Sequence, residues 1–229
     1  IIVTPAVTIL VGALLTVLTA KYIGAAASSI GNLIVWSTKL HPFWMGILVS
    51  VVVGVALTLP ISSAAICAAF GLVGLAGGAA VAGCCAQMVG FAVLSFKENR
   101  WGGILSQGLG TSMLQMPNII KNPKVWIAPT LASAITGPIA TCLFKMEMNG
   151  AAVSSGMGTC GLVGQIGVVT GWFSPSETAV AHGAAAISPN FMNWLGLILI
   201  CFVLPGVLCW AFGKVFRKIG WIKDGDLAL

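Results

Sequence analysis

The stretch NGAAVSSGMGTCGLVGQIGVVTGW, residues 149–172, decides how this chain must fold. It carries no charge, yet it is rich in glycine and hydroxyl groups, and long apolar segments lie on both sides of it. Irregular backbone at membrane depth is tolerated only where it is buried in protein or lines a watery cavity. The sequence therefore predicts that a solute binds along this glycine-rich run.

The composition of the whole chain places it in a membrane. Of its 229 residues, 58% are hydrophobic and only 7% are charged, and the mean hydropathy is +1.04. Soluble domains carry about 25% charged residues. Several uncharged windows reach the ~20 residues that cross ~30 Å of hydrocarbon as a helix. We therefore predict one all-α, polytopic membrane domain over residues 1–229, with about six spans, an interfacial amphipathic helix and a glycine-rich re-entrant hairpin.

The predicted spans follow the apolar windows, and prolines and glycines divide them. Residues 22–38 place apolar and polar side chains on different faces, which favours a helix in the membrane interface, with a tilted span as the alternative. Pro138 should kink the span that contains it. The Gly77–Gly78 pair should divide the long apolar segment 61–96 into two short helices. The remaining predicted spans are residues 2–20, 43–59, 125–144 and 191–212, and Lys21 is expected to end the first of them.

The basic residues predict the orientation. The net charge is +6, and the basic side chains lie at segment ends, which fits the positive-inside rule and not nucleic-acid binding. A cytoplasmic C-terminal tail puts eight of the eleven on the inner side: Lys97, Arg100, Lys121, Lys124, Lys214, Arg217, Lys218 and Lys223. This count requires the glycine-rich run to enter and leave from the outer side, as a re-entrant hairpin. Because Ile1 lies inside an apolar run, without an initiator Met or a positively charged leader, we interpret the sequence as a fragment or a processed chain.

Three polar clusters are candidates for binding a solute. Amides and hydroxyls both donate and accept hydrogen bonds, which suits a polyhydroxylated solute such as a sugar, and glycines let backbone amides approach it. A carboxylate could bind sugar hydroxyls, and a histidine could respond to pH. The candidates are Gln115 and Asn118 in the first cluster, Asn149, Ser155, Thr159 and Gln165 in the second, and Glu177 and His182 in the third.

Each cluster also has a structural interpretation. Gly158, Gly161, Gly164 and Gly167 recur every three residues, which is typical of a helix-packing face. The first cluster could be an interface loop, and the third could be a wet outer loop. The seven cysteines lie in apolar surroundings without metal-type spacing, so we interpret them as small buried hydrophobes and predict no metal and no cofactor. A weak internal echo relates residues 62–74 to residues 154–164, each with a serine pair followed by GLVG.

Three motifs carry a family resemblance: LPISSAAICAAFGLVGLAGGAA (59–80), GTSMLQMPN (110–118) and SSGMGTCGLVGQIG (154–167). With them the chain resembles the sugar-permease (enzyme IIC) family of the bacterial phosphotransferase system, in particular a stand-alone subgroup that includes a membrane regulator of toxin production. The resemblance implies a homodimeric permease in the bacterial plasma membrane that passes a sugar to a separate phosphorylating IIB subunit, itself served by IIA. Because members of the subgroup are usually longer at the N-terminus, it also implies further spans before residue 1. The Gly-Ile-Thr-Glu-Pro signature of glucose-type permeases is absent, so the resemblance assigns no role to Glu177.

The expected function is therefore solute movement by alternating access. No GxxxxGK[ST] motif occurs, so the chain shows no means of using ATP, and no catalytic constellation is visible. Two alternatives remain open from the residues. One is a membrane sensor that keeps the permease fold without transport, and the other is a transporter coupled to protons through Glu177 and His182.

Overall fold

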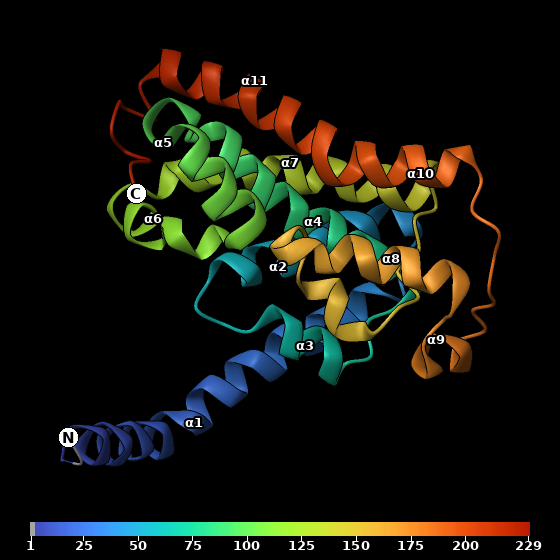
Figure 1. The fold of residues 1–229 in the computed structure, drawn as a ribbon, viewed down its shortest axis with the longest axis horizontal. Coiled ribbons are helices and arrows are strands. Elements are labelled where there is room, and N and C mark those ends of the chain that lie inside the picture. The colour runs from blue at the N-terminus through green and yellow to red at the C-terminus, as the bar shows by residue number, and fades with distance from the viewer. Residues whose placement is uncertain (1–2) are drawn as a thin grey trace.

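A computed structural model describes residues 3–229, and the side chains in that range except those at 3–6, 15, 18, 23, 26 and 27. The described chain is all helical (Figure 1). Its elements are α1 (Val3–Ser37), α2 (Pro42–Thr58), α3 (Ser63–Ala69), α4 (Gly74–Leu94), α5 (Phe96–Gly103), η1 (Ile104–Gly110), η2 (Ser112–Gln115), α6 (Met116–Lys121), η3 (Pro123–Trp126), α7 (Ile127–Pro138), η4 (Ile139–Leu143), η5 (Ala152–Gly156), η6 (Cys160–Leu162), α8 (Val163–Phe173), α9 (Glu177–Ala181), α10 (Phe191–Ile198), η7 (Leu199–Val203) and α11 (Leu204–Ile219).

Three continuous helical stretches in the described residues are long and apolar enough to cross a membrane. They are Gly74–Leu94, Pro123–Leu143 and Phe191–Ile219. The second and third confirm the predicted spans at 125–144 and 191–212. The predicted span at 43–59 corresponds to α2, which has 17 residues. Hydrogen bonding changes from α to π type directly after Pro138, because proline has no N–H for the helical ladder.

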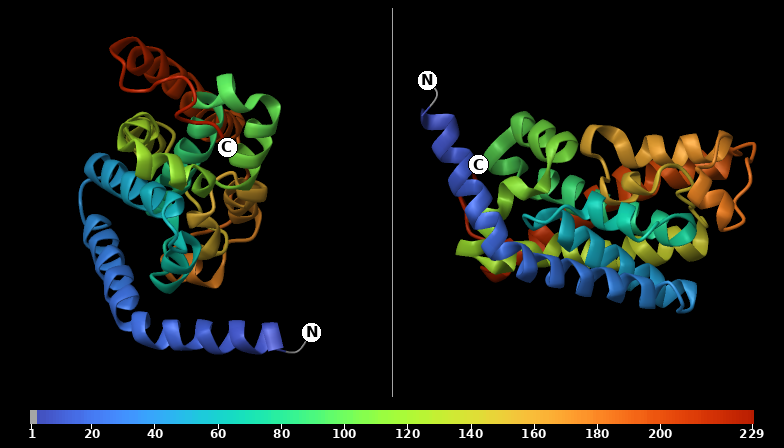
Figure 2. Two further views of the ribbon diagram at one scale, coloured as in Figure 1. Left: turned by 90° about the vertical axis from the view of Figure 1, so that its left-hand side faces the viewer. Right: turned by 90° about the horizontal axis from the view of Figure 1, so that it is seen from below.

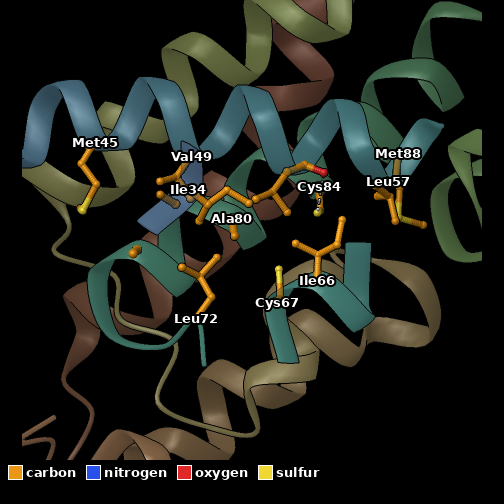
Figure 3. Packing of buried hydrophobic residues seen from close by; sticks show 13 residues of the cluster. Ile34, Met45, Val49, Leu57, Ile66, Cys67, Leu72, Ala80, Cys84 and Met88 are labelled. Atoms are coloured by element: carbon orange, nitrogen blue, oxygen red, sulfur yellow. Dashed lines mark hydrogen bonds between the residues drawn. The ribbon is translucent and has the colours of Figure 1, made fainter. Parts of the chain in front are cut away.

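α4 is the centre of the bundle, and small residues let its neighbours approach closely. A Cβ on Gly83 would collide with the backbone of Ser50 on α2, and one on Gly137 of α7 would collide with the backbone of Gly46. Ser50 Oγ donates to the Ser133 carbonyl across the α2–α7 contact (2.7 Å). Glycine contacts of this kind replace the hydrophobic driving force that helices lack in lipid. Buried apolar side chains of α1–α4 fill the space beside this contact (Figure 3).

The predicted division at Gly77–Gly78 is wrong. α4 passes through both glycines without a break, and the chain turns earlier, at residues 70–73 between α3 and α4. Position 78 requires glycine for a different reason: a Cβ there would collide with the Met146 carbonyl. The glycine pair therefore lets the segment that follows α7 pack closely on α4. The turn lies instead where Gly71 and Gly74 adopt positive φ (57° and 66°).

The predicted helix end at Lys21 is also wrong. α1 is one continuous helix of 35 residues, about 50 Å along its bent axis at 1.5 Å per residue. Its C-terminal part packs on α2 and α3, with Ile34 buried and Gly31 against the Phe70 ring. Its N-terminal part bends away from the bundle (Figure 2). The amphipathic stripe predicted for residues 22–38 includes positions 23, 26 and 27, whose side chains lie outside the described ones.

Candidate functional site

The glycine-rich run folds back on itself beside α4. The Met148 backbone pairs with that of Gly74 at the start of α4, and Thr159 Oγ1 donates to the Met88 sulfur, fourteen residues further along α4 (3.6 Å). α8 then returns toward the start of the run. A Cβ on Gly171 of α8 would lie 2.6 Å from the Gly150 nitrogen. The run therefore enters the bundle from the N-terminal end of α4, turns near Met88 and returns.

The turn of this run is built by left-handed backbone and one amide. Gly158 and Gly161 have φ of 54° and 52°, and Leu162 has φ of 59°. Gln165 Nε2 donates to Cys85 Sγ (3.2 Å); with the amide turned over, it donates instead to the carbonyls of Gly158 (3.1 Å) and Leu162 (3.3 Å). Carbonyls are stronger acceptors than a thiol, so we assign the second orientation. Gln165 thus closes the turn.

A second segment, residues 101–121, enters from the other end of α4. Gln107 Nε2 donates to Ser95 Oγ (2.8 Å), and Gly108 faces the Ala92 methyl group, so this amide-rich segment runs back along α4. It turns at Thr111, where Ser112 Oγ lies 2.9 Å from Thr58 Oγ1, and returns through α6. η1 contacts η6. The two segments therefore come from opposite ends of α4 and meet beside it.

A buried hydrogen-bond network centred on Gln87 lies beside this meeting point. The side chain of Gln87 is fully buried on α4, and its Oε1 accepts from Trp126 Nε1 (2.9 Å) and Thr58 Oγ1 (3.3 Å). Its Nε2 donates to the hydroxyls of Thr130 and Ser133, both at 3.4 Å. Sequence reasoning missed Gln87. The signal was present, because Gln87 is the only side-chain amide between residues 61 and 96.

Gln115 and Asn118 belong to an amide chain that holds the C-terminal segment. Asn118 Nδ2 donates to Gln115 Oε1, and Gln115 Nε2 donates to Gln107 Oε1, both at 2.9 Å. The same two amides also donate to the carbonyls of Ala228 (2.9 Å) and Leu227 (3.1 Å). The side-chain NH2 groups of both amides therefore have acceptors within the protein. In this conformation the predicted first cluster therefore fastens residues 227–228 to the amide-rich segment.

Asn149 and His182 line an open cavity at the opposite end of the bundle. Its volume is about 480 Å³, and it also borders Glu147 and the α3–α4 turn. Asn149 Nδ2 donates to Glu147 Oε2 (2.8 Å). Glu177 is exposed at the start of α9 and does not line this cavity.

The eight predicted site residues therefore occupy separate places. Ser155, Thr159 and Gln165 lie along the folded glycine-rich run, and Ser155 Oγ donates to the Leu72 carbonyl (2.5 Å). Asn149 and His182 share the open cavity, and Gln115 and Asn118 lie under the C-terminal segment. The two segments of the weak internal echo are neighbours: Ser63 Oγ donates to the Gly156 carbonyl (2.7 Å). α3 and η5 pack side by side.

The cysteine interpretation needs a correction. Five of the seven are buried, namely Cys67, Cys84, Cys85, Cys201 and Cys209. Cys142 is exposed and Cys160 is partly exposed. Cys142 follows the change to π-helix after Pro138. Cys160 lies at the turn of the glycine-rich run and packs, partly buried, against the apolar cluster that includes Cys84 and Met88 of α4.

The helical fold and its apolar, membrane-length helices define an all-helical integral membrane protein. The chain matches the family described as phosphotransferase system, EIIC, over residues 1–229, and it belongs to that family. It is therefore a permease component of a phosphotransferase system. No curated protein and no solved structure matches it.

Proposed function

We propose that this chain binds a sugar, or a similar small polar solute, where the two inward-turning segments meet, and moves it across the bacterial plasma membrane. The observation that carries the proposal is the contact between η1 and η6, beside Thr159, Ser112 and the Gln87 network. Buried polar groups at membrane depth are costly and are usually kept for function. Segments that break inside a membrane bundle commonly form the solute sites of transporters.

The chemistry of this place suits a polyhydroxylated solute. Hydroxyls and amides of Thr58, Gln87 and Ser112 satisfy one another, so we interpret this conformation as closed at this place. A sugar hydroxyl can replace either partner in each of these pairs, since it also donates and accepts. Within the part of the chain that the structure describes, the acceptor of Thr159 Oγ1 is the Met88 sulfur, which is weak, and a solute oxygen would be a better acceptor.

The distribution of charge supports a membrane orientation. The eight basic residues predicted to be cytoplasmic lie on α5, α6, η3, α11 and the segments next to them, at the end of the bundle near the C-terminus in Figure 1. Lys39 and Lys145 lie in loops at the other end. We propose that the basic end faces the cytoplasm and receives a separate IIB subunit. The glycine-rich run is then a re-entrant hairpin from the outer side.

We also retain the homodimer as a proposal. The N-terminal part of α1 projects from the bundle with exposed apolar side chains, among them Leu10, Leu14 and Val17. A second copy could cover them in the membrane. Native mass spectrometry from mild detergent gives the subunit number directly, and a monomer that transports would contradict the dimer.

Binding of solutes to purified protein tests the site. We expect one member of a sugar panel to bind, and Thr159→Val and Ser112→Ala to weaken its affinity by about tenfold each, for loss of one hydrogen bond. Thr178→Val and Ser188→Ala make the same chemical changes at exposed positions and should bind normally. If the site variants bind as well as these controls, the meeting point of the two segments is not the site.

Uptake into proteoliposomes tests the activity. We expect sugar uptake that requires a IIB subunit charged with phosphate, with the sugar recovered as its phosphate ester. Binding without uptake under any condition would favour the sensor. Uptake driven by a pH gradient and lost in Glu177→Gln would favour the proton-coupled alternative.

A further inference from the structure

A cavity on the side of the bundle has no part in the site described above. It has a volume of about 370 Å³ and lies between the end of α4, the start of α5 and α11. Neither the glycine-rich run nor the amide-rich segment after Arg100 contributes to its lining. The lining residues are Val93, Leu94, Phe96, Lys97, Arg100, Trp210, Gly213, Lys214 and Arg217.

Four of the lining side chains are cations, and two acids offset them only in part. Arg217 donates to Glu98 (2.8 Å) and to Asp224 (3.2 Å), and Lys97 pairs with Asp224 (2.7 Å). Among the described residues, no salt bridge is formed by Arg100 or Lys214. Four cations less two carboxylates leave a charge of +2 around the cavity, so it favours an anion.

The rest of the lining is apolar and aromatic. Trp210 is half exposed, and the Lys214 ammonium lies 3.7 Å from the centroid of its ring, so the cation sits above an aromatic face. A Cβ on Gly213 would lie 2.5 Å from Leu94 Cδ1, and its absence lets α11 lie close to α4 at the floor of the cavity. An occupant therefore meets positive charge at one part of the cavity and hydrocarbon at another.

The position of the cavity indicates that its occupant is a lipid. α4 ends at Leu94, and α11 belongs to the stretch Phe191–Ile219, and both are candidate membrane spans. The cavity lies where these spans reach the basic end, which is the depth of lipid headgroups. Basic pockets between spans at this depth bind anionic lipid headgroups. We propose that this cavity binds an anionic phospholipid, with its phosphate between Arg100 and Lys214 and an acyl chain along Val93 and Trp210.

Lipid binding to purified protein, resolved by native mass spectrometry, tests the proposal. We expect phosphatidylglycerol to bind more tightly than phosphatidylcholine with the same acyl chains. The double variant Arg100→Gln, Lys214→Gln should weaken phosphatidylglycerol binding by about thirtyfold, which corresponds to about 1 kcal/mol for each cation. The matched control, Lys121→Gln with Lys124→Gln, removes the same charge from the same end of the bundle but outside the cavity. It should weaken binding by less than about threefold, because exposed distant charges are screened.

Three results would overturn the proposal. Equal binding of the two lipids would mean an apolar groove without headgroup recognition. Equal losses in the two double variants would mean diffuse attraction to the whole basic end. Displacement of the lipid by equimolar inorganic phosphate would mean a free anion site. If the double variant does not fold, Lys214→Gln alone changes one exposed side chain, and a loss of about fivefold is then the expected result.

Discussion

Replacement of Gly158 by alanine probes how the turn of the glycine-rich run is seated on α4. Gly158 has φ of 54°, and an alanine there costs about 1–2 kcal/mol in the backbone alone. The new Cβ would also lie 2.6 Å from Cys84 Cβ and 2.8 Å from the Cys84 carbonyl carbon. Overpacking of this kind costs a further ~1–3 kcal/mol, because backbone cannot move aside as a flexible side chain can. The total is about 2–5 kcal/mol.

Gly161→Ala is the matched control for this variant. Gly161 has nearly the same φ, 52°, but its nearest neighbour to an added Cβ is Val163 Cγ2 at 3.8 Å. It should therefore cost only the backbone term of about 1–2 kcal/mol. For a chain of this length 1 kcal/mol lowers the Tm by about 3 °C, so we expect losses of about 10 °C for Gly158→Ala and about 4 °C for Gly161→Ala.

The assay is thermal unfolding of both purified variants in one detergent, at one scan rate, because membrane proteins often unfold irreversibly. The difference between the two variants isolates the contact with α4, since the backbone cost is shared. Equal losses of Tm would refute the reasoning: the turn of the run would then not rest on Cys84.

Three further predictions concern the rest of the bundle. Gln87→Leu leaves the Trp126 indole N–H without its acceptor, so we expect a loss of about 2–4 kcal/mol in thermal unfolding, and an unchanged Tm would contradict the buried network. Gly83→Ala forces α4 away from α2 and should lower the yield of folded protein, whereas Gly102→Ala, with open space around it, should not. The hydrogen bond from Lys97, and then its charge, hold the pKa of Asp224 below its ordinary value of 3.8. The carboxylate therefore stabilises the folded tail above pH 3.8, and this contribution is lost as the pH falls through the lowered folded pKa. ¹⁹F NMR of fluorotryptophan at Trp221 should show the tail loosening in acid, and Asp224→Asn should be loosened already at neutral pH.

Sequence reasoning succeeded where composition alone decides. Windows without charge had to become helices in lipid, and the spans at 125–144 and 191–212 follow from that. Sequence reasoning failed where one residue type has two structural roles. Gly77 and Gly78 were predicted to break a helix, but glycine also lets a helix approach its neighbours, and only the position of Met146 selects the second purpose. The helix end predicted at Lys21 was wrong for a related reason: one charge does not end a helix where the described side chains around it are exposed.

For the predicted binding residues too, residue type indicated polar positions, but tertiary contacts decided what each of them binds. Polar residue types identified Gln115, Asn118 and Gln165, yet in this conformation all three bind protein groups. Glu177 attracted attention as an isolated acid and lies exposed on α9, outside the cavity that His182 and Asn149 line. Gln87 was missed because a single amide in a long apolar window looks like a tolerated exception. Its importance depends on partners from three other elements, α2, α7 and η3.

The sequence by itself determined that the chain lies in a lipid bilayer, that it is helical, and which motifs carry its family resemblance. Scarce charge and long apolar windows are local properties, and they suffice to favour helices in lipid over helices in water. It also marked residues 149–172 as irregular. Only the tertiary structure decided that this run turns beside Met88 and meets a second segment from the other end of α4. That outcome depends on which glycine faces which backbone. Such pairings join residues as distant in sequence as Ser63 and Gly156, which are 93 positions apart, and no local pattern connects them.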